Sequence, residues 1–238
     1  MNYSQVQLSL KNKADPLRAE STKRFFKTGR GQYAEGDQFI GITLPDLRVL
    51  AKRYEDLGHS ELQILMASPV HEERLLALLI LTRQYKQDKQ AVYQFYVDNL
   101  QYVNNWDLVD ISAHLIMGEH LLDQEKDILL QLASSPNMWN RRVAMVATWQ
   151  FIRNNQFDWT IKIAAALLND THDLIHKAVG WMLRETGKRD QNVLFIFLTQ
   201  NAAYMPRIML RYAIEKLTEE QRQHFLNLKA ALLQRRIA

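Results

Sequence analysis

Five segments of the chain share one pattern, in which a short polar turn leads into an apolar helix. The segments recur at intervals of roughly 30 to 37 residues, a spacing typical of proteins built from stacked helix pairs. No stretch shows the two-residue alternation expected of strands. We therefore predict an all-α fold, a solenoid of helix pairs. The five segments begin near Ser68, Asn104, Ser135, Asp170 and Asn201.

Helix-start signals support this fold outside the repeat. Asp15 and Pro16 supply an N-cap and a proline at the first helical position, predicting a helix to about residue 27. Thr43 and Asp46 form a capping box that predicts a second helix, ending at Gly58. A helical apolar stripe is also predicted from Leu108, Ile111, Leu115 and Leu122.

Composition indicates a single domain. The 238 residues include only 8 glycines and 5 prolines, and no stretch is rich enough in them to form a linker. We expect one helical-repeat domain over residues 1–238, with residues 1–14 as a candidate for a loosely ordered N-terminal extension. The absence of cysteine excludes disulfides and thiolate metal sites. No signal-peptide or membrane-spanning run is present, so we expect a soluble, cytoplasmic protein.

The charge is distributed unevenly. From residue 140 onward there are 15 Lys and Arg against 8 Asp and Glu, whereas the preceding part has 15 against 18. A basic C-terminal part suggests a polyanionic partner, nucleic acid first and an acidic membrane second. A solvated basic surface with no such partner is the alternative that charge alone leaves open.

The repeat places four basic residues and one acid at about the same position in successive units. Equivalent positions in a solenoid line one concave face, so the fold prediction includes a basic groove. Such a face is unusual for a pure scaffold. The five residues are Arg74, Asp110, Arg142, Lys177 and Arg207.

One predicted helix carries cations and a tryptophan along a single face. Lys177, Trp181, Arg184 and Lys188 are spaced i, i+4, i+7 and i+11, which aligns them. A tryptophan between cations suits stacking on a sugar or base while the cations hold phosphates. A half-buried tryptophan with basic stems packed beside it is an equally weighted alternative. The opposite, packed side is predicted from Ile175, Ala178, Val179, Met182 and Thr186.

Trp106 and Asp110 form a second i, i+4 pair at the start of their helix. Asp107 is explained by a favourable position at the helix N-terminus. Asp110 lies off the apolar stripe and within the basic face. A carboxylate that must stay ionised is expected there, so we interpret Asp110 as functional rather than as an ordinary surface acid.

Other candidates are weaker. In RRVAMVATW, Arg142 is interpreted as an anion-binding residue and Trp149 as core. His172 and His176 share a helix face without a third ligand, so we expect no metal there. Four glycines in residues 29–41 lack the ending of a phosphate-binding loop and predict an ordered turn with positive φ angles.

Several of these motifs together resemble the AlkD-type DNA alkylation repair glycosylases, a family built of HEAT-like repeats. The resemblance runs from about residue 15 to residue 217. It rests on RFFKTGRGQYAEGDQFIGITLPDLR (24–48), NNWDLVD (104–110), NMWNRRVA (137–144) and HKAVGWMLRETGK (176–188). It implies removal of cationic alkylpurines, such as N3-methyladenine and N7-methylguanine, from duplex DNA.

Carried over by position, the resemblance assigns the catalytic carboxylate to Asp110 and the two active-site tryptophans to Trp106 and Trp181. It assigns the DNA-contacting arginines to Arg142 and Arg184. The basic faces add Lys177, Lys188, Arg207 and Arg211 as expected DNA-binding residues.

The resemblance and the chemistry of the residues give one leading hypothesis. An ionised carboxylate and two aromatic faces stabilise an oxocarbenium-like sugar while water attacks C1′. No metal or organic cofactor is expected. Alkylated duplex DNA is the expected partner. The protein is expected to be a monomer that associates with the nucleoid when it is bound to DNA. A non-catalytic DNA-binding protein and a protein-binding scaffold are the alternatives.

Overall fold

The computed structural model describes the backbone of residues 2–237 and the side chains of residues 2–228. The regular structure of this part is helical, and an isolated bridge joins the extended residues Gln38 and Val70. The predicted all-α fold is therefore confirmed. None of the helices formed by the described residues is both long and apolar enough to cross a membrane.

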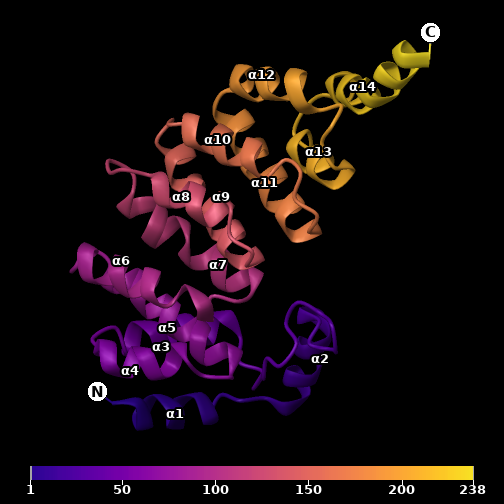
Figure 1. The fold of residues 1–238 in the computed structure, drawn as a ribbon. Coiled ribbons are helices and arrows are strands. Elements are labelled where there is room, and N and C mark those ends of the chain that lie inside the picture. Colours follow the sequence, from indigo (N-terminus) through magenta and orange to yellow (C-terminus); the bar gives the residue numbers. More distant parts are fainter. Residues whose placement is uncertain (1, 238) are drawn as a thin grey trace. The chain divides into compact units, whose positions relative to one another are not determined.

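The chain divides into two compact units, unit 1 over Met1–His120 and unit 2 over Leu121–Ala238. That residues 1–238 form one domain therefore stays a prediction. Unit 1 contains α1 (Tyr3–Lys11), α2 (Pro16–Phe26), α3 (Leu44–Arg53), α4 (His59–Met66), α5 (His71–Gln84), α6 (Lys89–Asp98), the 3-10 turn η1 (Leu100–Tyr102), α7 (Trp106–Ser112) and the π-helical turn η2 (His114–Gly118) (Figure 1).

Unit 2 contains the remaining helices. They are α8 (Asp127–Ala133), α9 (Met138–Arg153), α10 (Asp158–Ala166), α11 (Asp173–Arg189), α12 (Gln191–Asn201), α13 (Arg207–Ala213) and α14 (Glu219–Ile237).

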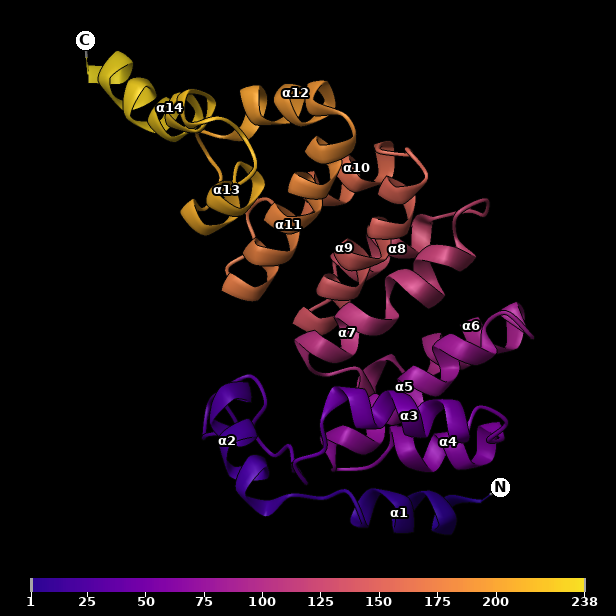
Figure 2. The ribbon, with the colours of Figure 1, turned by 180° about the vertical axis from the view of Figure 1, so that it is seen from behind.

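The five predicted repeat segments form every second helix from α5 to α13. In unit 1, α5 packs against α3, α4 and α7. In unit 2, α9 packs against α8, α10 and α11, and α11 packs against α12 and α13, as both views of the ribbon show (Figure 2). Repeated helix pairs are therefore the architecture within each unit, in agreement with the sequence.

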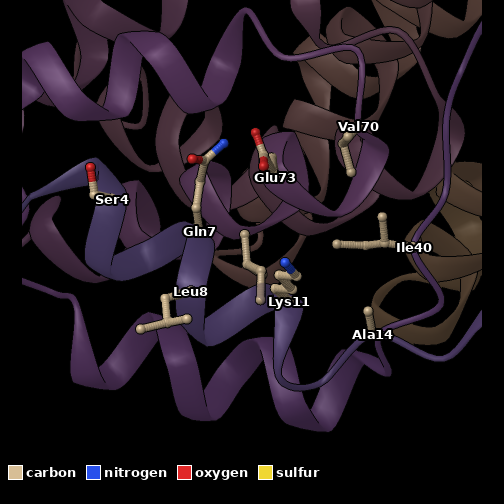
Figure 3. A pocket seen from close by; sticks show the side chains of 9 residues that line it. Ser4, Gln7, Leu8, Lys11, Ala14, Ile40, Val70 and Glu73 are labelled. Atoms are coloured by element: carbon tan, nitrogen blue, oxygen red, sulfur yellow. The ribbon is translucent and has the colours of Figure 1, made fainter.

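The N-terminal segment differs from the expectation of a loosely ordered extension. Asn2 and Gln5 form a reciprocal capping box that starts α1, and Val6 and Leu10 are buried. A cavity of about 470 Å³ lies beside α1, where the side chain of Glu73 sits among mostly apolar neighbours (Figure 3). It is lined by Ser4, Gln7, Leu8, Leu10, Lys11, Ala14, Ile40, Val70 and Glu73.

Two predicted helix boundaries have different outcomes. Asp15 caps α2 as expected, and its side chain accepts a hydrogen bond from the backbone N–H of Arg18. Thr43 caps α3, but the helix ends at Arg53 rather than at Gly58, which instead precedes α4. Tyr54 follows the helix with φ −108° and ψ 22°, and its buried side chain contacts α1, with its hydroxyl 2.6 Å from the Ser9 hydroxyl.

The apolar stripe predicted from residue 108 to residue 122 is interrupted. After α7 the chain makes the π-helical turn η2, in which the N–H of Gly118 donates to the carbonyl of Ala113 at 2.8 Å. Ile111, still in α7, is half-buried and Leu115 is exposed, whereas Ile116 and Met117 are fully buried. The packed side of this segment is therefore not the predicted stripe.

Candidate functional site

The motif NNWDLVD builds the start of α7 in unit 1. The side chain of the fully buried Asn105 accepts a hydrogen bond from the N–H of Trp106 at 2.8 Å and so caps the helix. Leu108 and Val109 fill the core. Trp106 and Asp110, one turn apart, are both half-buried. Asp110 therefore lies off the packed side, as its position in the sequence predicts.

Trp106 is held in an aromatic cluster from three elements. Its ring stacks on Phe26 of α2, with centroids 5.4 Å apart and an interplanar angle of 18°. Phe25 approaches its ring edge-on at 5.9 Å. Phe39, from the glycine-rich segment, stacks in turn on Phe26, with ring centroids 5.1 Å apart. The cluster fixes the orientation of the Trp106 ring while leaving it half-buried.

A buried group of charges adjoins this aromatic cluster. His71, the first residue of α5, places Nε2 at 2.8 Å from Oδ2 of Asp107 and Nδ1 at 3.6 Å from Oδ2 of Asp37. Arg74 donates to Oδ1 of the same Asp37 at 2.7 Å. The side chains of His71, Asp37 and Arg74 are 2%, 6% and 4% exposed. We call Asp37, His71, Arg74 and Asp107 the His71 cluster.

Opposite charges set the protonation of this cluster. Burial by itself lowers the pKa of His71, but Asp107 and Asp37 outweigh burial and raise that pKa to about 9. Burial raises the pKa of Asp37, and contacts with His71 and Arg74 reverse the effect, so its pKa is lowered. His71 is therefore an imidazolium between two carboxylates at neutral pH.

The glycine-rich segment positions Asp37 and Phe39. Gly31, Gly36 and Gly41 all have positive φ angles, which confirms the predicted ordered turn. A Cβ at Gly41 would lie 2.1 Å from the carbonyl oxygen of Asp15, so a larger residue does not fit. The buried carboxylate of Glu72 accepts from the N–H groups of residues 40 and 41, at 3.1 and 2.7 Å, and fastens the segment to α5.

The predicted face of α11 in unit 2 is present. Lys177, Trp181 and Arg184 are half-buried and Lys188 is exposed. Each cation already has a carboxylate neighbour: Asp173 for Lys177, Glu185 for Lys188, and both Glu185 and Glu215 for Arg184. The opposite side is fully buried, as predicted, and consists of Ile175, Ala178, Val179, Met182 and Thr186.

Trp149 was predicted as a core residue, and that prediction is wrong. The core positions near the end of α9 are taken by Thr148, Phe151 and Ile152, which rotates Trp149 to a half-buried position. Its ring centroid lies 5.1 Å from that of Trp181, at an interplanar angle of 59°. Trp181 is thus one half of an aromatic pair between α9 and α11.

The remaining basic residues of the predicted face differ in exposure. Arg142 is only 5% exposed and donates to the carbonyl of Leu174 at 2.6 Å. Arg207 and Arg211 on α13 are exposed, and Arg207 donates to the carbonyl of Leu226. Arg74 is buried in the His71 cluster. The equivalent positions of successive repeats therefore hold both buried and exposed cations, because the burial of each side chain depends on its neighbours as well as on the repeat.

The histidines of α11 have local structural partners. The Nδ1 atom of His172 accepts from the N–H of Leu174 and caps the helix, and Nε2 of His176 contacts the carbonyl of Asp170. Within the described residues, no three His, Asp or Glu side chains come together in a way that would hold a metal ion.

Most of the chain matches a known protein family. The sequence pattern of the family described as DNA alkylation repair enzyme matches residues 6–217, most of the chain. The chain belongs to this family. Its membership confirms the resemblance drawn from NNWDLVD and the other motifs, and it associates the chain with repair of alkylated DNA.

A solved structure supports the fold of this repair family member. It is similar to a protein of Enterococcus faecalis described as a predicted DNA alkylation repair enzyme, with a TM-score of 0.69 and 18% sequence identity. The likeness covers 87% of this chain and 98% of the other. No curated protein sequence matches the chain.

Sequence reasoning missed three features of this family member. The His71 cluster was overlooked because its members come from separate elements, although HEER after a turn is an unusually polar start for a buried helix. Trp149 was assigned to the core. Residues 16–30 carry five basic side chains and one acidic side chain. This local excess of positive charge does not show in the net negative charge of the N-terminal part as a whole.

Proposed function

We propose that this protein is a DNA N-glycosylase that excises cationic alkylated purines from duplex DNA. The observation that carries the proposal is the placement of Asp110 one helical turn from Trp106, a half-buried ring that an aromatic cluster and a buried charge cluster hold in position. A scaffold has no evident need to fix one tryptophan beside a carboxylate in this way. Membership of the repair family supports the same conclusion.

The substrate class follows from the chemistry. A purine alkylated at N3 or N7 already carries a positive charge and leaves readily when the glycosidic bond breaks. The enzyme must then mainly stabilise positive charge on the deoxyribose. An ionised Asp110 supplies a negative charge that stabilises it, and orients water for attack at C1′. The reaction consumes one water and yields a neutral free base, an abasic site and one proton. We expect no metal or organic cofactor to take part.

Aromatic faces suit the positive charge that develops on the sugar. The face of a tryptophan attracts a cation with about 0.5 to 2 kcal/mol, and we assign this role to Trp106 in unit 1 and to Trp181 in unit 2. The ring of Trp181 is supported by Trp149, which lies 5.1 Å away.

Phosphate binding is assigned chiefly to unit 2. This unit has 16 Lys and Arg against 11 Asp and Glu, whereas unit 1 has 14 against 15. We assign phosphate contacts to Arg142, Arg184, Lys177, Lys188, Arg207 and Arg211. Since Lys177, Arg184 and Lys188 have acidic neighbours, DNA phosphates must compete with those carboxylates, which favours modest affinity for undamaged DNA. We further propose a cytoplasmic monomer that is located at the nucleoid when bound to DNA.

The native protein can be tested directly. We would incubate it with two duplexes of identical sequence, one carrying a single N7-methylguanine and one undamaged, and measure both DNA binding and release of free base. The proposal predicts release from the methylated duplex only, in the presence of a metal chelator. Binding without release would indicate a non-catalytic DNA-binding protein. Neither binding nor release at low salt would indicate a protein-binding scaffold.

A further inference from the structure

The His71 cluster joins three segments that are distant in the sequence. Asp37 belongs to the glycine-rich segment, His71 and Arg74 to α5, and Asp107 to the first turn of α7. The cluster also receives a weak hydrogen bond, because Asn104 donates to Asp37 at 3.4 Å. Two residues of NNWDLVD other than Trp106 and Asp110 therefore reach the same buried charges.

The imidazole of His71 is connected to Trp106 by two routes. One is the contact of Nε2 with Asp107, the residue that directly follows Trp106 in the chain. The other is a column of rings: His71 lies 5.0 Å from Phe26, and Phe26 stacks on Trp106. His71 also stacks on Phe39 at 4.7 Å. A change in the imidazole therefore reaches both the backbone and the ring of Trp106.

We propose that His71 is a positioning residue, which as an imidazolium bridges Asp107 and Asp37 and thereby holds the first turn of α7, with Trp106 and Asp110, in place for catalysis. The inference rests on the proposed glycosylase function of Trp106 and Asp110. His71 itself touches neither substrate nor reacting atoms. Its role is to fix the geometry of residues that do.

The charge balance of the cluster supports this role. The charged groups that face His71 are Asp107 from α7, Asp37 from the glycine-rich segment and Arg74 from α5 itself. With His71 protonated, these two cations and two carboxylates balance. Loss of the proton leaves one uncompensated negative charge in a buried setting, which is costly. The buried Nδ1 of His71 and Oδ2 of Asp37 make no hydrogen bond among the described residues and face each other at 3.6 Å. Attraction between these atoms thus depends on the imidazolium charge.

Because Asp107 and Asp37 raise the pKa of His71 to about 9, a pH titration can test the proposed contacts. We would record NMR spectra of the full-length protein from pH 6 to pH 10 and follow the His71 ring and the Trp106 indole N–H, assigned with His71→Gln and Trp106→Phe. The inference predicts that both signals titrate together near pH 9. It also predicts that Asp107→Asn moves the His71 midpoint downward. A Trp106 signal that ignores the titration of His71 would overturn the proposal.

Kinetics provide the second readout. Displacing a reacting group by about 1 Å can cost on the order of 100-fold in rate. We therefore expect His71→Gln to lower the single-turnover rate of N7-methylguanine release at pH 7.5 by about 10- to 100-fold, with the DNA Kd within twofold. Asp107→Glu, which keeps the charge pair with His71, should retain more of the native rate than Asp107→Asn does. Full activity of a folded His71→Gln protein would contradict the inference.

A matched control is available in the same unit. His120 stacks on Tyr93, with ring centroids 3.8 Å apart, and has no place in the His71 cluster. His120→Gln should leave the rate and the Trp106 signal unchanged. Should His71→Gln fail to fold, the native titration and Asp107→Asn still test the bridge. The two proposals also fail differently: a native protein that releases no base refutes the glycosylase, whereas the NMR titration judges the bridge without any substrate.

Discussion

Trp106 is the residue on which the unusual contacts of unit 1 converge. A half-buried tryptophan is common, but this one is stacked on Phe26, contacted edge-on by Phe25 and followed directly by a carboxylate in a buried ion pair. Such support reduces the number of orientations that the ring can adopt. It is expected where an aromatic face must meet a transition state without reorganisation.

The stability of the protein should depend on pH through His71. Because its pKa is raised from 6.5 to about 9 in the folded state, the imidazolium stabilises the fold fully below pH 6.5. This contribution is lost as the pH rises through 9. We expect the free energy of unfolding, measured with urea, to fall by on the order of 3 kcal/mol across this window.

The decrease should be specific to His71. His71→Gln should flatten the profile between pH 6.5 and pH 9. His120→Gln should retain the decrease, because burial and Lys89 lower the pKa of His120 and place its titration below this window. An unchanged slope in His71→Gln would show that another group is responsible.

At the scale of elements, two glycines of α11 provide a matched pair. A Cβ at Gly180 would lie 2.5 Å from the carbonyl oxygen of Met209 and from Cβ of Tyr212, so α13 must move. A Cβ at Gly187 would instead meet Cδ2 of Leu194, the end of a flexible side chain. The close packing of α11 and α13 therefore depends on Gly180.

We expect Gly180→Ala to lower the free energy of unfolding by about 1 to 3 kcal/mol through overpacking. Gly187→Ala should stay within about 1 kcal/mol of the native protein, because better helix propensity offsets the movement of Leu194. Urea unfolding of both variants measures the difference. Equal stability of the two variants would contradict the proposed role of Gly180 in the packing of α13.

The elements also show what the sequence could and could not predict. Apolar periodicity located the helices of the repeat, and the packed side of α11 was predicted residue by residue. It chose the wrong side of α7 and η2, where Ile111 is half-buried and Leu115 is exposed. The end of α3 was also predicted wrongly, because the helix stops at Arg53, before Gly58. The half-buried positions of Asp110 and Trp181 were predictable from local spacing, whereas the His71 cluster depends on tertiary contacts that local spacing does not reveal.

At the scale of the whole molecule, charge should control DNA binding. Each phosphate contact that is lost reduces the slope of log K against log salt concentration by about 0.9. Arg211→Ala removes an exposed cation of α13 and should weaken binding on all sequences and lower the slope by about this amount. Lys162→Ala removes an exposed cation from α10, a helix that carries none of the residues assigned to phosphate, and should leave the slope unchanged. Equal slopes for both variants and the native protein would contradict the assignment of Arg211.

The central claim is that Asp110 performs catalysis in a DNA glycosylase. The most direct measurement is the single-turnover release of N7-methylguanine by Asp110→Asn, with Asp98→Asn as a control for loss of an exposed carboxylate in the same unit. Removing one electrostatic catalytic group typically costs about 100- to 1000-fold in rate. We predict a loss of this size in Asp110→Asn, with DNA binding within twofold of the native protein and full activity in Asp98→Asn. Release at the native rate by Asp110→Asn would contradict the account.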